Sequence, residues 1–169
     1  MDKPELNVIR YTDMEAMFNI FNDEKVSKYY MIPEFNNEQD KYHLFKFFIM
    51  LSNDEKRFVR GIRLDNKLIG FINDVGSSNG SIELGIALSS KYHGKGIGTK
   101  AFSTAIAELF DRGYKEVIAG CFIENEASRR MMEKCGMTKT DIVEEIEYRN
   151  EIHEAIYFKI DNAHSVSCK

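Results

Sequence analysis

Apolar residues recur along this chain at two different spacings, and the spacing changes several times between residues 6 and 160. Alternation of apolar and polar residues predicts a β-strand, whereas apolar residues three and four positions apart predict an amphipathic helix. Alternation or a short apolar run predicts strands at residues 6–11, 58–64, 67–75, 82–88 and 117–122, and a long hairpin over residues 138–160. Helices are predicted at residues 14–21, 37–51, 99–112 and 125–136.

Turn residues separate the predicted strands and set their pairing. Asp65 and Asn66 stand between two strand-like stretches and predict a two-residue hairpin turn. Residues 76–80 are polar and predict a loop, and Arg149 and Asn150 predict the turn of the long hairpin. Hairpin turns join antiparallel strands, so we expect a mixed sheet that is mostly antiparallel.

Capping residues mark the ends of the predicted helices. Thr12 or Asp13 is placed to cap the first helix, and Asn125 is placed to cap the last. Gly113 and Gly136 stand where a helix commonly ends in a left-handed residue. The expected fold class is therefore α/β (α+β), with a central sheet of about six or seven strands flanked by about four helices.

A glycine-rich segment joins the strand predicted at residues 82–88 to the helix predicted at residues 99–112. It reads Lys91-Tyr92-His93-Gly94-Lys95-Gly96-Ile97-Gly98-Thr99. Glycines at alternate positions let successive backbone N–H groups converge on one point. The start of the helix adds unpaired N–H groups and the positive end of the helix dipole. The segment therefore predicts a phosphate-binding loop.

Other interpretations of this loop are weaker. No match to the P-loop pattern G-x-x-x-x-G-K-S/T exists in the chain. Residues 96–101 do fit the dinucleotide fingerprint G-x-G-x-x-G/A, and Glu124 follows the next strand where a ribose-binding acid would stand. Only about seventy residues follow the loop, however, which are too few for the parallel strands of a full dinucleotide fold. A glycine-rich turn without a ligand is the simplest alternative.

A second motif follows the apolar stretch at residues 117–122. It contains Asn125 and Ser128, and then Glu133, Lys134, Gly136 and Met137. This run resembles N-x-x-S followed by a helix ending in E-K-x-G-F, one signature of the GNAT superfamily of acetyl-CoA-dependent N-acetyltransferases, with Met137 in place of the aromatic residue. Residues 93–98 resemble the other signature, Q/R-x-x-G-x-G/A, except that His93 stands at the first position.

The resemblance covers nearly the whole chain. Residues 6–13 are similar to the opening L-x-L-R-x-x-T-x-x-D of the RimJ/RimL-like branch, which includes ribosomal-protein N-terminal acetyltransferases. The resemblance to the GNAT superfamily implies a GNAT-like sheet and an N-acetyltransferase that moves an acetyl group from acetyl-CoA to a primary amine by direct attack. The branch implies that the acceptor is a protein N-terminus.

The resemblance also implies which residues bind acetyl-CoA, the cosubstrate. The backbone of the strand is expected to pair with the pantetheine arm, the loop to bind the pyrophosphate, and the second motif to contact the cofactor. The implied cofactor-binding residues are Ile86, Ala87, Leu88, His93, Gly94, Lys95, Gly96, Ile97, Gly98, Thr99, Asn125 and Ser128. No metal is implied.

Glu83 is the candidate general base. Along residues 82–88 the side chains of Ile82 and Leu84 point to one face, while Glu83, Gly85 and Ala87 point to the other. That second face carries small residues, as if something lay closely over it. A solvated glutamate on a half-exposed sheet is the alternative, and the resemblance favours the base, because an acid in this strand often has that role in the family.

The remaining catalytic roles come from the resemblance. The backbone N–H of Leu88 is the expected oxyanion donor, and Ser128 is the expected acid for the leaving thiolate. Many relatives place a tyrosine near Met132 for the second task, and the RimJ/RimL-like branch is thought to use the serine instead. Cys121 is expected to be a buried spectator thiol, so an acyl-cysteine route is disfavoured.

Recognition of the acceptor is predicted to involve two segments. Residues 26–35 are aromatic and irregular, and we expect them to form one wall of the acceptor cleft. Acidic residues crowd the C-terminal hairpin at Asp141, Glu144, Glu145, Glu147, Glu151 and Glu154. Such a run is usually a solvated face, and it also has the sign to steer a cationic acceptor.

Composition narrows the class of protein. The chain has 169 residues and a mass of 19.6 kDa, which fits a single domain spanning residues 1–169 with its core at about 6–160. A net charge of −4 disfavours nucleic-acid binding, and no apolar run is long enough for a membrane span or a signal peptide. Cys121, Cys135 and Cys168 form neither a metal-ligand spacing nor an even disulfide set. We expect a cytoplasmic enzyme, monomeric or homodimeric.

Two alternatives to an acetyltransferase of protein N-termini remain open on the sequence. A small amine such as a polyamine or an aminoglycoside would need no change in the catalytic residues. A non-catalytic CoA-binding domain would keep the phosphate-binding loop and lose the chemistry. Release of CoA in the presence of a primary amine separates this last class from an enzyme.

Overall fold

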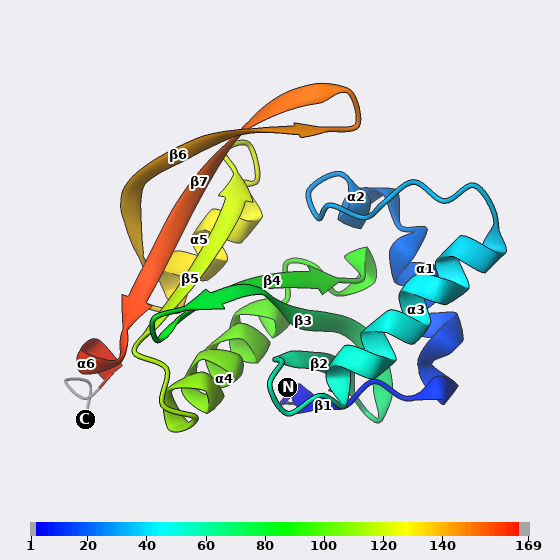
Figure 1. Cartoon of the computed structure of the whole chain (residues 1–169), viewed down its shortest axis with the longest axis horizontal. Coiled ribbons are helices and arrows are strands. Elements are labelled where there is room, and N and C mark those ends of the chain that lie inside the picture. The colour runs from blue at the N-terminus through cyan, green and yellow to red at the C-terminus, as the bar shows by residue number, and fades with distance from the viewer. Residues whose placement is uncertain (1–2, 166–169) are drawn as a thin grey trace.

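Seven strands form one sheet in the part of the chain described by the computed structural model, residues 3–165 (Figure 1). The strand order is β1-β2-β3-β4-β5-β7-β6, and every neighbouring pair except β4 and β5 is antiparallel. The strands are β1 (Glu5–Asn7), β2 (Val59–Leu64), β3 (Lys67–Ser78), β4 (Ser81–Leu88), β5 (Glu116–Phe122), β6 (Thr138–Tyr148) and β7 (Glu151–Asp161). The mixed, mostly antiparallel sheet is confirmed. Cys168 lies outside the described residues.

Helices cover both faces of the sheet (Figure 1). They are α1 (Met14–Phe21), α2 (Glu24–Ser27), α3 (Glu38–Ser52), α4 (Ile97–Asp111), α5 (Glu126–Lys134) and α6 (Asn162–Ser165), with 3₁₀ turns η1 (Tyr11–Asp13) and η2 (Ser90–Tyr92). Helices α4 and α5 pack on one face, and α1, α2 and α3 pack on the other. The four longer described helices α1, α3, α4 and α5 match the four that were predicted.

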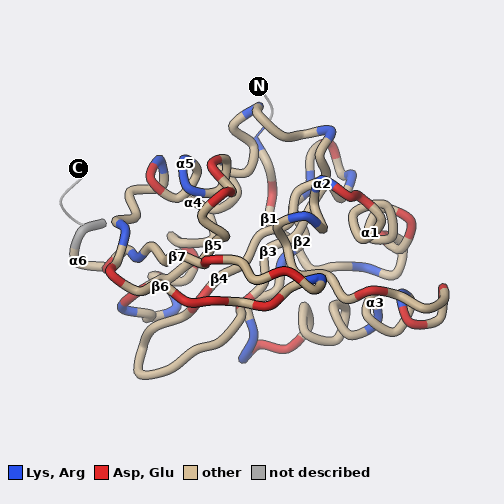
Figure 2. Tube along the Cα trace, turned by 90° about the horizontal axis from the view of Figure 1, so that it is seen from above, with Lys and Arg blue, Asp and Glu red and all other residues tan. Residues whose placement is uncertain are grey.

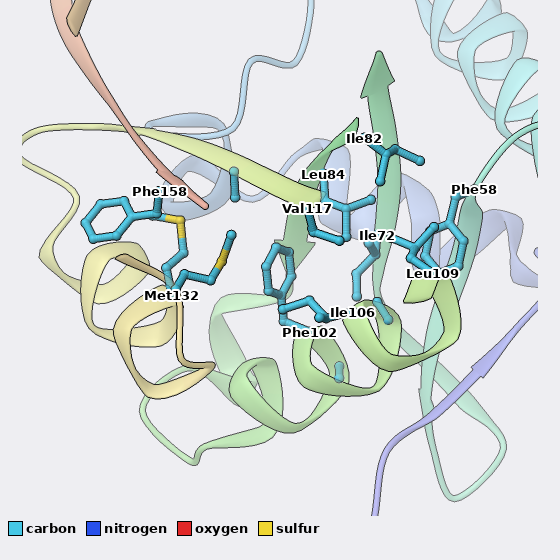
Figure 3. Close-up of a cluster of buried hydrophobic side chains, with 14 of the residues drawn as sticks. Phe58, Ile72, Ile82, Leu84, Phe102, Ile106, Leu109, Val117, Met132 and Phe158 are labelled. Atoms are coloured by element: carbon cyan, nitrogen blue, oxygen red, sulfur yellow. The ribbon is translucent and has the colours of Figure 1, made fainter. Parts of the chain in front are cut away.

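Two hydrophobic cores lie on the two faces. Figure 3 shows the first, in which Phe102, Ile106 and Leu109 of α4 point at strand residues that include Ile82 and Leu84. The second core joins α1 and α3 to the opposite face, where Ala87 of β4 is buried. Side chains of β4 therefore alternate between the two faces as predicted.

The pairing of β4 with β5 is short. The two parallel strands pair only through Ser81, Ile82 and Glu83, opposite residues 116–118 of β5. Beyond Glu83, β4 continues to Leu88 and β5 continues to Phe122 without further pairing to each other. The facing edges of the two strands are therefore unpaired in the half of the sheet that lies beside the glycine-rich loop.

Two strand boundaries differ from the predictions. Strand β1 ends at Asn7, because the chain turns into η1 at Tyr11 instead of running extended to residue 11. Residues 76–78 belong to β3, and the turn that was predicted as a loop at 76–80 consists of Asn79 and Gly80 with positive φ. The polar residues 76–78 are exposed and still pair across the hairpin, so polarity was a poor guide to their backbone conformation.

Most predicted turns and caps are confirmed. Asp65-Asn66 and Arg149-Asn150 have positive φ at both residues, as a two-residue hairpin turn of type I′ requires. Asn125 Oδ1 accepts a hydrogen bond from the backbone N–H of Ser128 at 3.1 Å, which caps α5. Gly113 and Gly136 have φ of +95° and +81° just beyond their helices.

Asp13 has a different role from the one predicted. It stands at the N-cap position of α1, but its carboxylate makes no capping hydrogen bond to that helix. The two oxygens instead accept hydrogen bonds from the buried Arg63 guanidinium at 2.9 and 2.6 Å, and one also accepts from the backbone N–H of Arg10. This ion pair joins the start of α1 to β2. Each of the two groups needs the other, because a buried charge without a partner is strongly destabilising.

Candidate active site

The free edge of β4 presents backbone donors toward the gap beside β5. The N–H of Ser89 donates to Ile69 O on β3 at 2.9 Å. Backbone groups alternate in direction along an extended strand, so the N–H groups of Leu88 and Ile86 point away from β3. Strand β5 pairs with β4 only as far as Glu83. These donors therefore lie on a free edge of β4, to which an extended ligand can pair.

The glycine-rich loop closes one end of this gap. Gly94 and Gly96 have φ of +73° and +74°, a conformation that side-chain-bearing residues rarely adopt, and Gly96 is the N-cap of α4. Lys100 N–H makes the first helical hydrogen bond, to Gly96 O at 3.1 Å. The preceding N–H groups of the helix therefore have no partner in the helix and point out of its N-terminus. No atom lies within 4 Å of a Cβ built on either glycine, so an anion has room to approach the backbone.

Three predicted elements of the site converge at Gly98. A Cβ built on Gly98 would lie 3.7 Å from Leu88 Cδ2 and 3.7 Å from Met131 Sδ. The start of α4, the end of β4 and the middle of α5 are therefore in contact distance of one another. The two motifs of the sequence therefore lie next to each other in the fold.

His93 contacts the end of β4. Its Nε2 lies 2.7 Å from Leu88 O, and since a carbonyl only accepts, the ring nitrogen must carry the proton. The bond fixes the loop to the residue whose N–H is the expected oxyanion donor. His93 stands where the signature has glutamine or arginine. Its side chain forms a hydrogen bond within the protein, to Leu88 O.

Ser128 lies against the end of β5. Burial raises the pKa of the nearby Cys121 thiol to about 11, although the neighbouring Ser128 hydroxyl acts in the opposite direction. A thiol with so high a pKa is protonated near neutral pH and is a weak nucleophile. Cys121 is therefore suited to a passive role.

Glu83 lies at the point where β4 and β5 separate. It is half-buried, and burial, followed by the negative charge of Glu144, raises the pKa of its carboxyl group above the ordinary value. A Cβ on the neighbouring Gly85 would lie 3.3 Å from Asn73 Oδ1 and 3.4 Å from the Tyr30 ring. Tyr30 donates to Asn73 Oδ1 at 2.7 Å. The face that carries Glu83 is therefore covered by polar and aromatic groups, as the small residues of this strand suggested.

The two segments predicted to line the acceptor side lie together. The Tyr148 hydroxyl on β6 donates to Ser27 O at 2.5 Å, and the carbonyls of Tyr30 and Ile32 lie at 3.3 and 3.4 Å from it. A cavity of about 420 Å³ lies beside this contact, lined by Ile32, Pro33, Glu34, Glu147, Tyr148, Arg149 and Asn150. The C-terminal hairpin thus closes on the segment after α2, which Figure 1 also shows.

Several residues of this region were not singled out in the sequence, although Tyr30 lies within the predicted segment 26–35. Asn73, Tyr30, Tyr148 and Tyr157 all contribute polar groups to the expected acceptor side. Asn73 could have been noticed, because it is the first polar residue after the apolar run of β3. The hydrogen bonds of the three tyrosines join segments far apart in the chain, so no local pattern predicted these contacts.

A cavity larger than the one beside Tyr148 lies elsewhere. It measures about 760 Å³ and lies beside the ends of α3 and α4, with Arg57, Arg60 and Arg112 in its lining. Arg57 pairs with Asp74, while Arg60 and Arg112 both pair with Glu108. None of the expected site residues lines it, so this cavity is separate from the gap between β4 and β5.

Residues 3–165 contain no cluster of three or more His, Cys, Asp or Glu side chains that could hold a metal ion. No helix in that same part of the chain is long and apolar enough to cross a membrane.

Comparison with known proteins establishes the family. The family model described as the acetyltransferase (GNAT) domain matches residues 5–138. The chain therefore belongs to the GNAT family of acetyltransferases, whose fold uses acetyl-CoA. YoaA of Bacillus subtilis (strain 168), described as an uncharacterized N-acetyltransferase, is 26% identical over 154 residues, which cover 88% of this chain and 87% of the relative.

Two solved structures share the fold. Spermidine N-acetyltransferase from Vibrio cholerae, in complex with CoA and spermine, matches with a TM-score of 0.81 and 17% identity, covering 98% of this chain and 99% of its own. RimL, the ribosomal L7/L12 α-N-protein acetyltransferase in complex with CoA, matches with the same TM-score and 15% identity, covering 94% of each chain. At these identities the likeness shows the fold, so the RimJ/RimL-like branch stays a prediction.

Proposed function

We propose that this N-acetyltransferase moves the acetyl group of acetyl-CoA directly to a primary amine held in the gap between β4 and β5. The observation that carries the proposal is the arrangement around that gap. The gap is lined by the free edge of β4 and by the glycine-rich loop at the N-terminus of α4. Glu83 lies where the two strands separate, and Ser128 lies beside the end of β5. Residues 1–169 are expected to act as one cytoplasmic domain, either monomeric or homodimeric.

Cofactor binding follows from the backbone. The loop from His93 to Thr99 would hold the pyrophosphate on N–H groups at the start of α4. The edge from Ile86 to Leu88 would pair with the amides of the pantetheine arm, as a strand pairs with an added strand. Asn125 uses Oδ1 to cap α5, which leaves its Nδ2 group able to donate to the cofactor.

Each catalytic role has one residue. Glu83 would accept a proton from the acceptor ammonium, directly or through water, and so free the neutral amine to attack, because its raised pKa makes it a stronger base than an ordinary glutamate. The Leu88 N–H would donate to the oxygen of the carbonyl as the amine adds to its carbon. Ser128 would give a proton to the thiolate as the carbon–sulfur bond breaks, which releases CoA and the acetylated amine.

The acceptor is the least specified part of the proposal. We infer a protein N-terminus, which residues 6–13 support through their similarity to the RimJ/RimL-like branch. A small polyamine is the second candidate, because acidic residues line the hairpin side of the site and the spermidine enzyme has an equally similar fold. Both acceptors carry a protonated amine at neutral pH.

A screen of acceptors tests the proposal. Purified protein is incubated with acetyl-CoA and peptides with free N-termini, spermidine or an aminoglycoside, and both CoA release and the acetylated product are measured. We expect release of CoA to match formation of an acetylated amine. Tight binding of acetyl-CoA with no transfer to any amine would support a non-catalytic CoA-binding domain instead.

The phosphate-binding loop gives a separate prediction. Gly96→Ala should raise the dissociation constant for acetyl-CoA by about tenfold or more, since a hydrogen bond to a charged group is worth about 1.5–3 kcal/mol. The new Cβ would occupy the open space in front of the loop N–H groups. Isothermal titration with acetyl-CoA measures the change.

Gly113→Ala is the matched control. Gly113 also has positive φ with no atom within 4 Å of a built Cβ, but it lies at the other end of α4. Its alanine variant bears a similar backbone strain and should bind acetyl-CoA as the wild type does. Equal affinities for the two variants would refute the placement of the pyrophosphate.

A further inference from the structure

Strand alternation separates the acidic residues of the hairpin into two groups. Figure 2 shows that acidic positions recur along β6 and β7. Glu144 lies opposite Ala155, and Glu145 lies opposite Glu154, so Glu144 and Glu145 point to opposite faces of the hairpin. A charge run that is uniform in the sequence is therefore two different surfaces in the structure.

Glu144 shares the face that carries Glu83. Ala155 and Tyr157 are two residues apart on β7, and Tyr157 lies opposite Gly120 of β5. Glu83 lies opposite Ile118, which is two residues from Gly120 on the same strand. Residues two apart on a strand, and residues directly opposite on neighbouring strands, face the same side of a sheet. Glu144, Tyr157 and Glu83 therefore stand on one face, across β7 and β5.

The ring of Tyr157 packs against the backbone of β5 at Gly120. A Cβ built on Gly120 would lie 2.7 Å from Tyr157 Cε1, so the ring lies directly on the backbone of β5 and no larger residue fits there. The Tyr157 hydroxyl donates to Glu144 Oε2 at 2.6 Å. The tyrosine thus fixes the Glu144 carboxylate by one oxygen and leaves the other oxygen for a ligand.

The three groups also interact through their charges. The pKa of Glu83 is raised by burial and then by Glu144, and the pKa of Tyr157 is raised by burial and by both glutamates. Two other polar groups of this face already have partners. Lys159 pairs with Glu116 at 2.9 Å, and Tyr30 donates to Asn73. A cation brought to this face would therefore meet two carboxylates beside a neutral phenol.

We propose that Glu144, positioned by Tyr157, completes an acceptor subsite with Glu83 and selects acceptors that carry a protonated amine. The inference rests on the proposed function, because it assigns this role within the same site. Glu144 binds the ammonium by a charge-assisted hydrogen bond, and Glu83 takes the proton that the amine must lose. Neutralising all the hairpin acids together would mix this subsite with an unrelated surface, so single variants are required.

Glu144→Gln and Glu145→Gln form a matched pair, because they remove the same charge from neighbouring residues on opposite faces. With spermidine and a tetrapeptide with a free N-terminus as probes, Glu144→Gln should raise the acceptor KM by about tenfold, the loss of one charge-assisted hydrogen bond. The KM for acetyl-CoA should stay unchanged. Glu145→Gln should leave both values within about twofold of wild type, because Glu145 points to the opposite face of the hairpin.

A pH profile separates this role from a structural one. The negative charge of Glu144 raises the pKa of Glu83, so its removal should shift the acid limb of kcat/KM to lower pH. Tyr157→Phe keeps the ring on Gly120 and loses only the hydroxyl. It should raise the acceptor KM in the same direction and by less than Glu144→Gln.

Binding measurements keep the inference testable if no transfer occurs. Absence of turnover with both probes would count against the proposed function, and calorimetry of spermidine with the CoA-loaded protein would still compare the two glutamine variants. The inference requires weaker binding in Glu144→Gln than in Glu145→Gln. Equal acceptor KM values and equal acid limbs for the two variants, or equal spermidine binding or none, would overturn it.

Discussion

Glu83→Gln is expected to lower kcat/KM for acetyl transfer by about 100-fold or more at neutral pH, the usual contribution of a positioned base. Glutamine keeps the size of the side chain at the point where β4 and β5 separate, but it cannot accept the proton of the ammonium. Steady-state rates with a saturating acceptor and with limiting acceptor would measure the loss in kcat and in kcat/KM.

The loss should depend on pH with a definite sign. Below the raised pKa of Glu83 the wild-type carboxyl is protonated and cannot act as a base, so the wild-type rate falls as pH falls through that pKa. The variant lacks this limb. At high pH the free amine is abundant without a base, so the two rates should approach each other.

Glu5→Gln is a suitable control for this prediction. Glu5 lies on β1, the edge strand at the far end of the sheet from the C-terminal hairpin, and should not affect transfer. A loss in Glu83→Gln that is the same at every pH, or no loss, would remove Glu83 as the base and leave it a half-buried surface carboxylate.

Ser128→Ala is expected to lower kcat by about 100-fold while leaving the affinity for acetyl-CoA nearly unchanged. A proton donor to the thiolate acts only as the carbon–sulfur bond breaks, so its loss is felt in turnover rather than in binding. The substitution should not destabilise α5, because the cap uses the backbone N–H of Ser128 and Asn125 Oδ1. Turnover and calorimetric binding of acetyl-CoA measure the two effects separately.

Ser103→Ala provides the comparison for Ser128. Ser103 on α4 is likewise a serine near a cysteine and donates to Cys135 Sγ at 3.3 Å, but it stands outside the proposed catalytic group. It should retain wild-type turnover. A fall of less than about threefold in Ser128→Ala would be far below the usual effect of a positioned acid and would assign that role to water or another group.

The sequence predicted the fold well because its local patterns agree with the packing. The alternation of residues 82–88 places Ile82 and Leu84 against α4 and Ala87 against the other core, as the structure shows. The predicted end of β3 was wrong, because polar residues were taken to form a loop although their backbone is extended. Residues 76–78 are polar because they are exposed, and they are extended because they pair with the start of β4.

The candidate site was predictable only in part. The glycine loop, Asn125 and Ser128 belong to contiguous motifs, so the glycine spacing and the resemblance to the GNAT signatures were enough to single them out. The face around Glu83 is assembled from β6, β7 and the segment after α2, and no local pattern records those contacts. Glu144 and Glu145 are the same residue type side by side, and only the register with β7 distinguishes them.

The central claim is direct transfer between two substrates held together in the gap between β4 and β5. Initial rates measured while acetyl-CoA and the amine are both varied test it most directly. Direct attack predicts double-reciprocal lines that intersect, with no acetyl group on the protein when the amine is omitted. Parallel lines, together with an acetylated Cys121 found by mass spectrometry in the absence of amine, would contradict it.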